Sequence, residues 1–128
     1  MTDMITVRTL RQLDALVEEH IFKVFSKETL DRNPELAPNY STWLGLEPVI
    51  QNREDAGFEW SIGRDFLGCY SAVLTRDVAE HYCGDSGSAP VAFCLAALAS
   101  TGVRVRCDLD YSPHFARGYT VQNSEALL

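Results

Sequence analysis

Apolar residues recur at helical spacing in two parts of the chain. Between residues 9 and 25 they follow steps of three and four residues, with charged side chains on the opposite side, which predicts an amphipathic helix. Thr9 and Gln12 have the spacing of a capping box and mark the start of this helix. Residues 89–100 form the strongest helical segment, and Gly102 stands where a left-handed residue ends a helix. We expect this second helix to face a sheet through four side chains: Val91, Cys94, Leu95 and Leu98.

The segment that follows the first helix is less regular. Residues 27–39 contain two prolines and show no periodicity, which predicts a connection without regular structure. A further helix is expected over residues 43–51, with Ser41 or Thr42 as its cap. Pro48 weakens this prediction because a proline within a helix removes a hydrogen bond. The alternative is a short turn followed by a helix that begins at Pro48.

Alternation of apolar and polar residues predicts strands. We expect them over residues 58–62, 66–74, 79–83 and 103–107. The first two are separated by Gly63-Arg64-Asp65, which is short enough for a hairpin, so they should pair antiparallel. The last strand alternates valine with arginine, and part of the stretch 111–128 should pair at a sheet edge. The chain is therefore predicted to be one α+β domain over residues 1–128, with helices packed on a small, mainly antiparallel sheet.

The charge of the chain bears on its partners. Eighteen acidic and eleven basic side chains give a net charge of −7, which argues against direct nucleic-acid binding. An acidic surface suits docking on a basic protein groove, and the alternative is a surface that serves solubility alone. We expect no membrane span and no secretory signal, and therefore a cytoplasmic protein. The candidate contact residues are Glu18, Glu19, Trp43, Glu54, Asp55, Asp108 and Asp110.

Residues 84–87 read Gly-Asp-Ser-Gly, the sequence that surrounds the nucleophilic serine of trypsin-like proteases. The chain is too short for the two barrels of such an enzyme, and His81 stands only five residues before Ser86. We interpret the motif as a turn that opens the following helix, in which the glycines let the chain turn and Ser86 or Ser88 accepts hydrogen bonds from the first free N–H groups. We therefore expect no catalytic residue and a protein that is not an enzyme.

The same helix start is also a candidate anion site. Free N–H groups and the positive end of a helix dipole attract phosphate, provided that arginine side chains point the same way. Asp85 would oppose an anion there. The candidate residues for an anion or a nucleotide are Tyr40, Ser86, Ser88, Arg104 and Arg106.

Four cysteines lie at irregular spacing: Cys69, Cys83, Cys94 and Cys107. In a chain without a signal peptide the thiols should be reduced, and Cys94 lies in an apolar helical run where a thiol is usually core packing. No Cys-x-x-Cys pair is present. We expect no metal and no cofactor; a metal site would have to join His81, Cys83 and Cys107.

Several segments, taken in order, resemble the phage ABA-sandwich domain family of small bacteriophage and prophage proteins. They are Leu-Asp-Ala-Leu at 13–16, Tyr-Ser-Thr at 40–42, Ala-Pro at 89–90 and Cys-Leu-Ala-Ala-Leu at 94–98. The resemblance covers residues 10–105 and leaves residues 109–128 as an extension. It implies helices layered on an antiparallel sheet, and no established activity. Trp43 stands where the family pattern has an aspartate, either exposed as a contact residue or buried under Pro48.

These observations favour a phage accessory protein that acts by binding. We expect it to antagonise a bacterial defence system by docking on a host protein or complex, in the manner of anti-CRISPR proteins. One alternative is a sponge that sequesters a nucleotide immune signal, and another is a structural or assembly protein of the phage particle. An enzyme that uses Ser86, His81, Cys83 or Asp85 is the least favoured alternative, and a homo-oligomer stays open.

Overall fold

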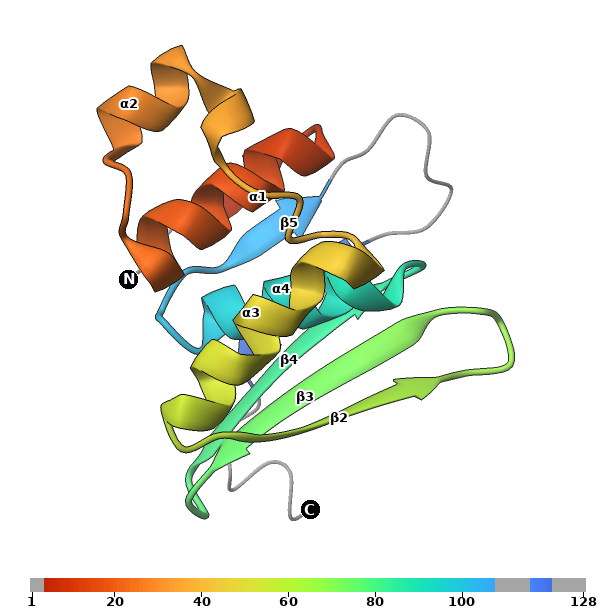
Figure 1. Ribbon diagram of the computed structural model, residues 1–128. Helices are drawn as coiled ribbons and strands as arrows, with labels where there is room; N and C mark the ends of the chain where they lie inside the picture. Colours follow the sequence, from red (N-terminus) through yellow and green to blue (C-terminus); the bar gives the residue numbers. More distant parts are fainter. Residues whose placement is uncertain (1–3, 108–115, 121–128) are drawn as a thin grey trace.

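The structure is a computed structural model that describes residues 4–107 and 116–120. Within this part of the chain, helices pack on one mainly antiparallel sheet, which confirms the expected α+β fold class (Figure 1). The strands lie in the order β1-β5-β6-β4-β3-β2; β1 and β5 are parallel and the other neighbours antiparallel. Their bounds are β1 (Ile5–Val7), β2 (Glu59–Arg64), β3 (Tyr70–Arg76), β4 (Glu80–Ser86), β5 (Val105–Cys107) and β6 (Ala116–Thr120).

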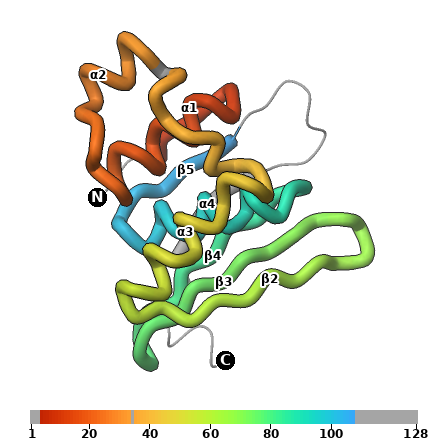
Figure 2. Tube along the Cα trace, in the orientation of Figure 1, coloured from red at the N-terminus to blue at the C-terminus, as the bar shows by residue number. Residues whose placement is uncertain are grey.

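The helices lie in the N-terminal half of the chain and between β4 and β5. Their bounds are α1 (Leu10–Val17), α2 (Lys27–Arg32), α3 (Trp43–Asp55) and α4 (Ala89–Ala99), with a π-helical turn η1 (Glu18–Phe22) after α1 and a 3-10 turn η2 (Pro34–Leu36) after α2. Figure 2 traces the same path and shows α1 and α2 on the side of α4 that lies away from β2 and β3.

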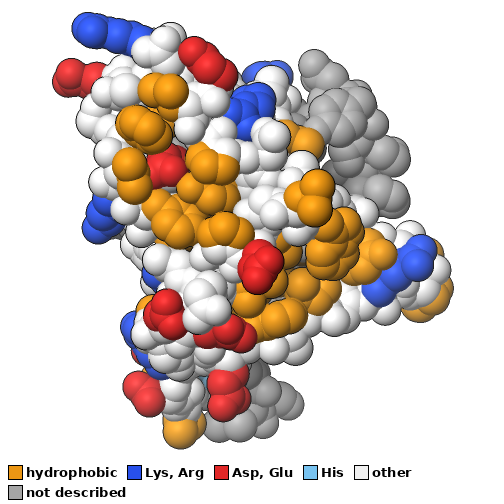
Figure 3. Space-filling model, viewed as in Figure 1, with side chains coloured by type: hydrophobic (Ala, Val, Ile, Leu, Met, Phe, Trp, Pro, Cys, Tyr) orange, Lys and Arg blue, Asp and Glu red, His pale blue; other side chains and the backbone are white. Residues whose placement is uncertain are grey.

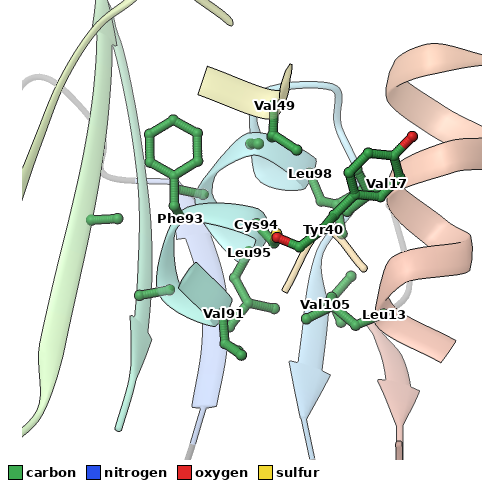
Figure 4. Close-up of a cluster of buried hydrophobic side chains, with 14 of the residues drawn as sticks. Leu13, Val17, Tyr40, Val49, Val91, Phe93, Cys94, Leu95, Leu98 and Val105 are labelled. Atoms are coloured by element: carbon green, nitrogen blue, oxygen red, sulfur yellow. The ribbon is translucent and has the colours of Figure 1, made fainter. Parts of the chain in front are cut away.

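Helix α4 is buried along its whole length, because the sheet covers one side of it and α1 and α3 cover the other. A helix that is apolar all round belongs inside a core. Figure 4 shows its side chains between α1, α3 and β5. The predicted helix over residues 89–100 is thus confirmed, and Val91, Leu95 and Leu98 are buried. The prediction that Cys94 faces the sheet was wrong, because its Sγ lies 3.4 Å from the carbonyl oxygen of Tyr40, on the opposite side of α4.

Gly84 brings α4 close to the sheet. A Cβ atom on this residue would lie 2.1 Å from the carbonyl oxygen of Ala92 and 2.7 Å from the amide nitrogen of Ala96. Gly84 and Ser86 both belong to β4, so the prediction that they form a turn before the helix was wrong. The glycine is required by the contact between strand and helix, since any larger residue would push α4 off β4.

The N-terminal helix starts as predicted. Thr9 and Gln12 form both hydrogen bonds of a capping box. The helix ends earlier than expected, where Lys23 adopts φ 59° after η1. The prediction that residues 27–39 lack regular structure was wrong for α2 and η2. Ser26 caps α2 by accepting from the N–H of Thr29, and a helix of six residues is too short to show an apolar repeat.

The predicted helix over residues 43–51 is confirmed and extends to Asp55. Thr42 is its cap and accepts from the N–H of Gly45 at 3.1 Å. Pro48 lies inside this helix, which therefore begins before it. A proline at this position leaves the carbonyl of Leu44 without its helical donor. Leu44 is 97% exposed, so water can hydrate that carbonyl and the helix continues.

The expected hairpin is present, with its loop shifted along the chain. Strand β2 pairs antiparallel with β3 over its full length. The loop is residues 65–69, where Asp65 Oδ1 accepts from the N–H groups of Leu67 and Cys69 and Gly68 adopts φ 87°. The predicted strand over residues 66–74 therefore begins too early, because the Asp65 side chain holds its first residues in the loop.

The C-terminal strands complete the sheet. In β5, Val105 and Cys107 are buried and Arg106 is exposed, which confirms the predicted alternation. Strand β6 pairs with β4 on one side and β5 on the other. Part of the stretch 111–128 does pair, but within the sheet and not at its edge as predicted. The sequence pattern of this strand does not show how many neighbours it has.

Candidate functional site

The start of α3 is held in place by a buried carboxylate of α1. Asp14 is 1% exposed, and its Oδ1 accepts from the N–H of Ser41 at 2.9 Å. Arg11 pairs with Asp14 at 3.0 Å and also donates to the Asn39 side chain and the Ala37 carbonyl. Burial raises the pKa of Asp14 above its ordinary value of 3.8, against the opposing effects of its hydrogen bonds with Ser41 and of Arg11. The loop into α3 is thereby anchored to α1.

A second buried carboxylate anchors the same loop. The Tyr40 hydroxyl donates to Glu18 Oε1 at 2.8 Å, and Glu18 Oε2 accepts from the N–H of Val24 at 3.0 Å. Phe22 stacks on the Tyr40 ring at a centroid distance of 4.9 Å. Tyr40 is 4% exposed and Glu18 is 2% exposed. Burial, followed by the hydrogen bond to Glu18, raises the pKa of Tyr40.

This network contradicts the predicted roles of two site residues, Glu18 and Tyr40. Glu18 was expected on an acidic docking surface, and Tyr40 was expected in a nucleotide pocket. Both are buried in contact with each other. Their polar groups are used to join η1 to the loop before α3, because a buried polar group must find a partner inside the protein.

The start of α4 is shaped by two serines. Ser86 is 5% exposed, and its Oγ accepts from the N–H of Ser88 at 3.1 Å. Ser88 is the N-cap residue of α4, but its side chain makes no capping hydrogen bond, and the N–H that Ser86 accepts from is that of Ser88 itself. The prediction that one of these serines accepts from the first N–H groups of the helix was therefore wrong. His81 and Ser86 lie an odd number of residues apart in β4 and therefore point to opposite faces of the sheet. These two residues do not form a nucleophile–base pair.

A cavity of about 410 Å³ lies where the starts of α3 and α4 meet the start of β3. Its lining is Ser41, Thr42, Trp43, Tyr70, Gly87, Ser88, Ala89 and Pro90. Trp43 is 67% exposed, which decides in favour of the exposed alternative for this residue. Leu44, the next residue, is almost fully exposed, so two large exposed apolar residues follow one another at the start of α3.

The β2–β3 hairpin adds a second apolar pair. Phe66 and Leu67 are 96% and 72% exposed, in the loop that leads to Tyr70 of the cavity. The guanidinium of Arg64 lies 5.6 Å from the centroid of the Tyr70 ring. Figure 3 shows apolar side chains on this face from the start of α3 toward the hairpin, with basic atoms at the hairpin end. We call the two apolar pairs, Trp43-Leu44 and Phe66-Leu67, together with the cavity, the docking surface.

The predicted acidic contact residues do not gather around Trp43. Glu54 and Asp55 lie at the opposite end of α3, about 16 Å away at the rise of a helix. Glu54 accepts from the indole N–H of Trp60, and Asp55 accepts from Gln51. The carboxylate of Glu19 pairs with His20 on η1. The remaining two candidates, Asp108 and Asp110, lie outside the described residues.

The predicted nucleotide residues are also separated. Arg106 is in register with Arg117 of β6, which is in register with Asp85 of β4. Asp85 is next to Gly84, which faces α4, so this row lies on the opposite face of the sheet. Arg106 therefore points away from the start of α4, and the neighbouring Arg104 is exposed. Ser86 and Ser88 do not form a joint anion site with these arginines.

The cysteines are free thiols, and all but Cys69 are buried. Cys83 lies on the sheet face that points away from α4, whereas Cys107 shares the register row of Ala116 on the other face. His81, Cys83 and Cys107 therefore do not converge. Across the described residues, no three His, Cys, Asp or Glu side chains are grouped so that they could hold a metal ion.

No family model, curated protein or solved structure matches this chain. In residues 4–107 and 116–120, none of the helices combines the length and apolar character that a membrane span requires.

Sequence reasoning found Trp43 and missed the rest of the docking surface. Leu44 directly follows Trp43 in the first turn of α3, where a pair of large apolar residues cannot both face the core. The sequence pattern places Phe66 and Leu67 in a strand, in which one of the two side chains would face the core. The signal that was available is Asp65, because an aspartate followed by Gly68 is typical of a loop.

Proposed function

We propose that this protein acts by binding another protein through the docking surface. The observation that carries the proposal is a cavity of about 410 Å³ lined by the exposed Trp43 and by Tyr70, with exposed apolar residues next to each of them in the chain: Leu44 after Trp43, and Phe66-Leu67 in the loop that leads to Tyr70. Large apolar side chains exposed together around a hollow are typical of protein interfaces, in which tryptophan and tyrosine are frequent anchors. The surface is built on rigid elements, since buried Asp14 and Glu18 anchor the loop before α3.

The resemblance to phage proteins supports a bacterial host protein as the partner. In this proposal the protein is a phage accessory protein that works in the host cytoplasm and blocks a defence complex. The net charge of −7 favours a partner whose surface is basic around an apolar centre. The acidic side chains then act at a distance, by attracting the partner, and the apolar pairs make the contact.

The test compares two variants in the full chain. Trp43→Ala combined with Leu44→Ser removes the apolar pair on α3. Val78→Ser is the matched control, because Val78 is 76% exposed in the turn at the far end of β3. Partners captured from a lysate of the bacterial host are quantified, and the affinity of each purified candidate is measured by calorimetry.

We expect the Trp43/Leu44 variant to lose at least tenfold in affinity, which corresponds to about 1.4 kcal/mol, while the Val78 variant binds as the parent does. A partner that binds all three proteins equally would contradict this docking surface.

A further inference from the structure

Strand β2 is an edge of the sheet that the described residues form. It is six residues long, it pairs along its full length with β3, and it is the last strand in the sheet order. The described part of the chain places no strand on its other side. Edge strands are usually shortened, interrupted by a bulge or proline, or protected by charged side chains, lysine above all. The strand, Glu-Trp-Ser-Ile-Gly-Arg, has no proline, lysine or bulge and carries its two charges only at its ends, whereas the opposite edge β1 is only three residues long.

Gly63 in this strand is not required by the fold of a single chain. Its φ is not positive, and a Cβ atom built on it would have no atom within 4 Å. A glycine inside a strand costs roughly 0.5–1 kcal/mol relative to alanine. Glycine at such a position often marks the close approach of another backbone. Ser61 lies on the same face two residues earlier, so the middle of this face of β2 carries two small residues, with Glu59 at its start.

We propose that β2 pairs antiparallel with β2 of a second copy of this chain, which joins the two sheets into one. A twofold axis perpendicular to the sheet places residues of the same face opposite each other. The register centred on Ile62 sets Ile62 opposite its own copy, Trp60 opposite Arg64, and Ser61 opposite Gly63. The residues from Trp60 to Arg64 thus have suitable partners, and Glu59 comes opposite Asp65 just beyond the end of the other strand.

The strongest cross-strand contact in this register is between Trp60 and Arg64, and the symmetry forms it twice. The Trp60 ring packs edge-on against Phe93 at 5.6 Å and is still 39% exposed. Arg64 already lies on an aromatic ring, that of Tyr70. A guanidinium over an indole face is a favourable cation–π pair. The alternative register centred on Ser61 sets Trp60 opposite Ile62 and leaves Arg64 opposite Phe58, which is buried.

Cysteine cross-linking tests the pairing and its register. The background is Cys69→Ser, because Cys69 is the half-buried thiol and the other three are buried. Directly opposite residues of antiparallel strands have Cα atoms about 4.5–5.5 Å apart, within reach of a disulfide. Ile62→Cys should therefore form a disulfide-linked dimer under mild oxidation. Ser61→Cys is the matched control, since its two copies are offset along the strands and should stay unlinked.

The mass in solution gives a second readout. We expect light scattering to show twice the chain mass of 14.3 kDa for the parent at high concentration. Gly63→Lys should shift this mass to that of one chain, because the lysine side chain takes the space in which Ser61 of the second copy would lie. The open space around Gly63 lets the monomer keep its fold and circular dichroism.

The outcomes separate the possibilities. Linkage of Ser61→Cys in place of Ile62→Cys would overturn the register. A parent of single-chain mass with no linkage in either variant would overturn the pairing. Trp43→Ala should leave the dimer unchanged, so the test is independent of the proposed docking surface.

Discussion

At the scale of single residues, glycines occupy two kinds of position in this protein: some are in close contact with other backbone atoms, and one has open space around it. Gly84 lies in β4 against the backbone of α4, and a Cβ on Gly45 would lie 1.8 Å from the carbonyl oxygen of Asn39. Gly63 has open space around it. The sequence around Gly84, Gly-Asp-Ser-Gly, is equally compatible with a turn and with a strand beneath a helix. The difference depends on a tertiary contact, which no local pattern contains.

Gly84→Ala should destabilise the protein by about 1–3 kcal/mol or more, because the added methyl would overlap backbone atoms that cannot rotate away. Gly63→Ala is the matched control and should unfold at the same urea concentration as the parent or higher, since its methyl meets no atom within 4 Å. Both are measured by urea unfolding at a concentration where the protein is monomeric. Equal midpoints for Gly84→Ala and the parent would contradict the close contact between β4 and α4.

Asp14 gives the stability of the protein a defined pH dependence. Its pKa is raised by burial, so the folded protein binds this proton more tightly than the unfolded chain does. The contribution of Asp14 is therefore largest at low pH and declines as pH rises from its ordinary value of 3.8 through the raised value.

Asp14→Asn removes this titration and keeps an oxygen for the N–H of Ser41. The difference in free energy of unfolding, parent minus variant, should fall as pH rises through that interval and then level off. Urea unfolding of both proteins across the acidic range measures it. A difference that grows with pH would mean that the pairing with Arg11 outweighs burial.

At the scale of elements, the sequence predicts helices whose ends carry a capping residue or a left-handed glycine. It fails for elements whose position depends on contacts with distant parts of the chain. The cap at Thr9 and the left-handed Gly102 (φ 89°) mark the helix termini that the structure contains. Helix α2 was missed because only Leu30 of its six residues is buried. Three residues of the docking surface, Leu44, Phe66 and Leu67, were missed because nothing in the sequence marks an apolar side chain that the fold leaves exposed.

Helix α4 should tolerate no charge on any side. Leu95 is 0% exposed, so Leu95→Asp should unfold the domain, because an unpaired buried charge costs several kcal/mol. Leu44→Asp makes the same substitution at a residue that is 97% exposed and should change stability by less than about 0.5 kcal/mol. Thermal melting of the two variants provides the comparison. A Leu95→Asp protein that melts like the parent would show that α4 is not the centre of the core.

At the scale of the whole molecule, the proposed binding function gives charge and apolar surface different roles. The net charge of −7 is not concentrated around the cavity, because the described acidic residues that the sequence singled out are used in local contacts or lie at the other end of α3. Such charges act on a partner while it is still separated by solvent. The apolar pairs act only once the surfaces meet, because burial of apolar area requires contact.

The two contributions should separate in the kinetics of partner binding. Association should slow as salt rises, because exposed charges are screened over about 10 Å at about 0.1 M salt, while dissociation should change little. Trp43→Ala should do the reverse, raising the dissociation rate at least about tenfold with little effect on association, as expected for a buried aromatic anchor. Glu54→Lys with Asp55→Lys, at the far end of α3, should slow association toward a basic partner and leave dissociation unchanged. Surface plasmon resonance at several salt concentrations measures both rates. A Trp43→Ala variant that dissociates like the parent would move the contact away from the start of α3 and back toward the acidic side chains.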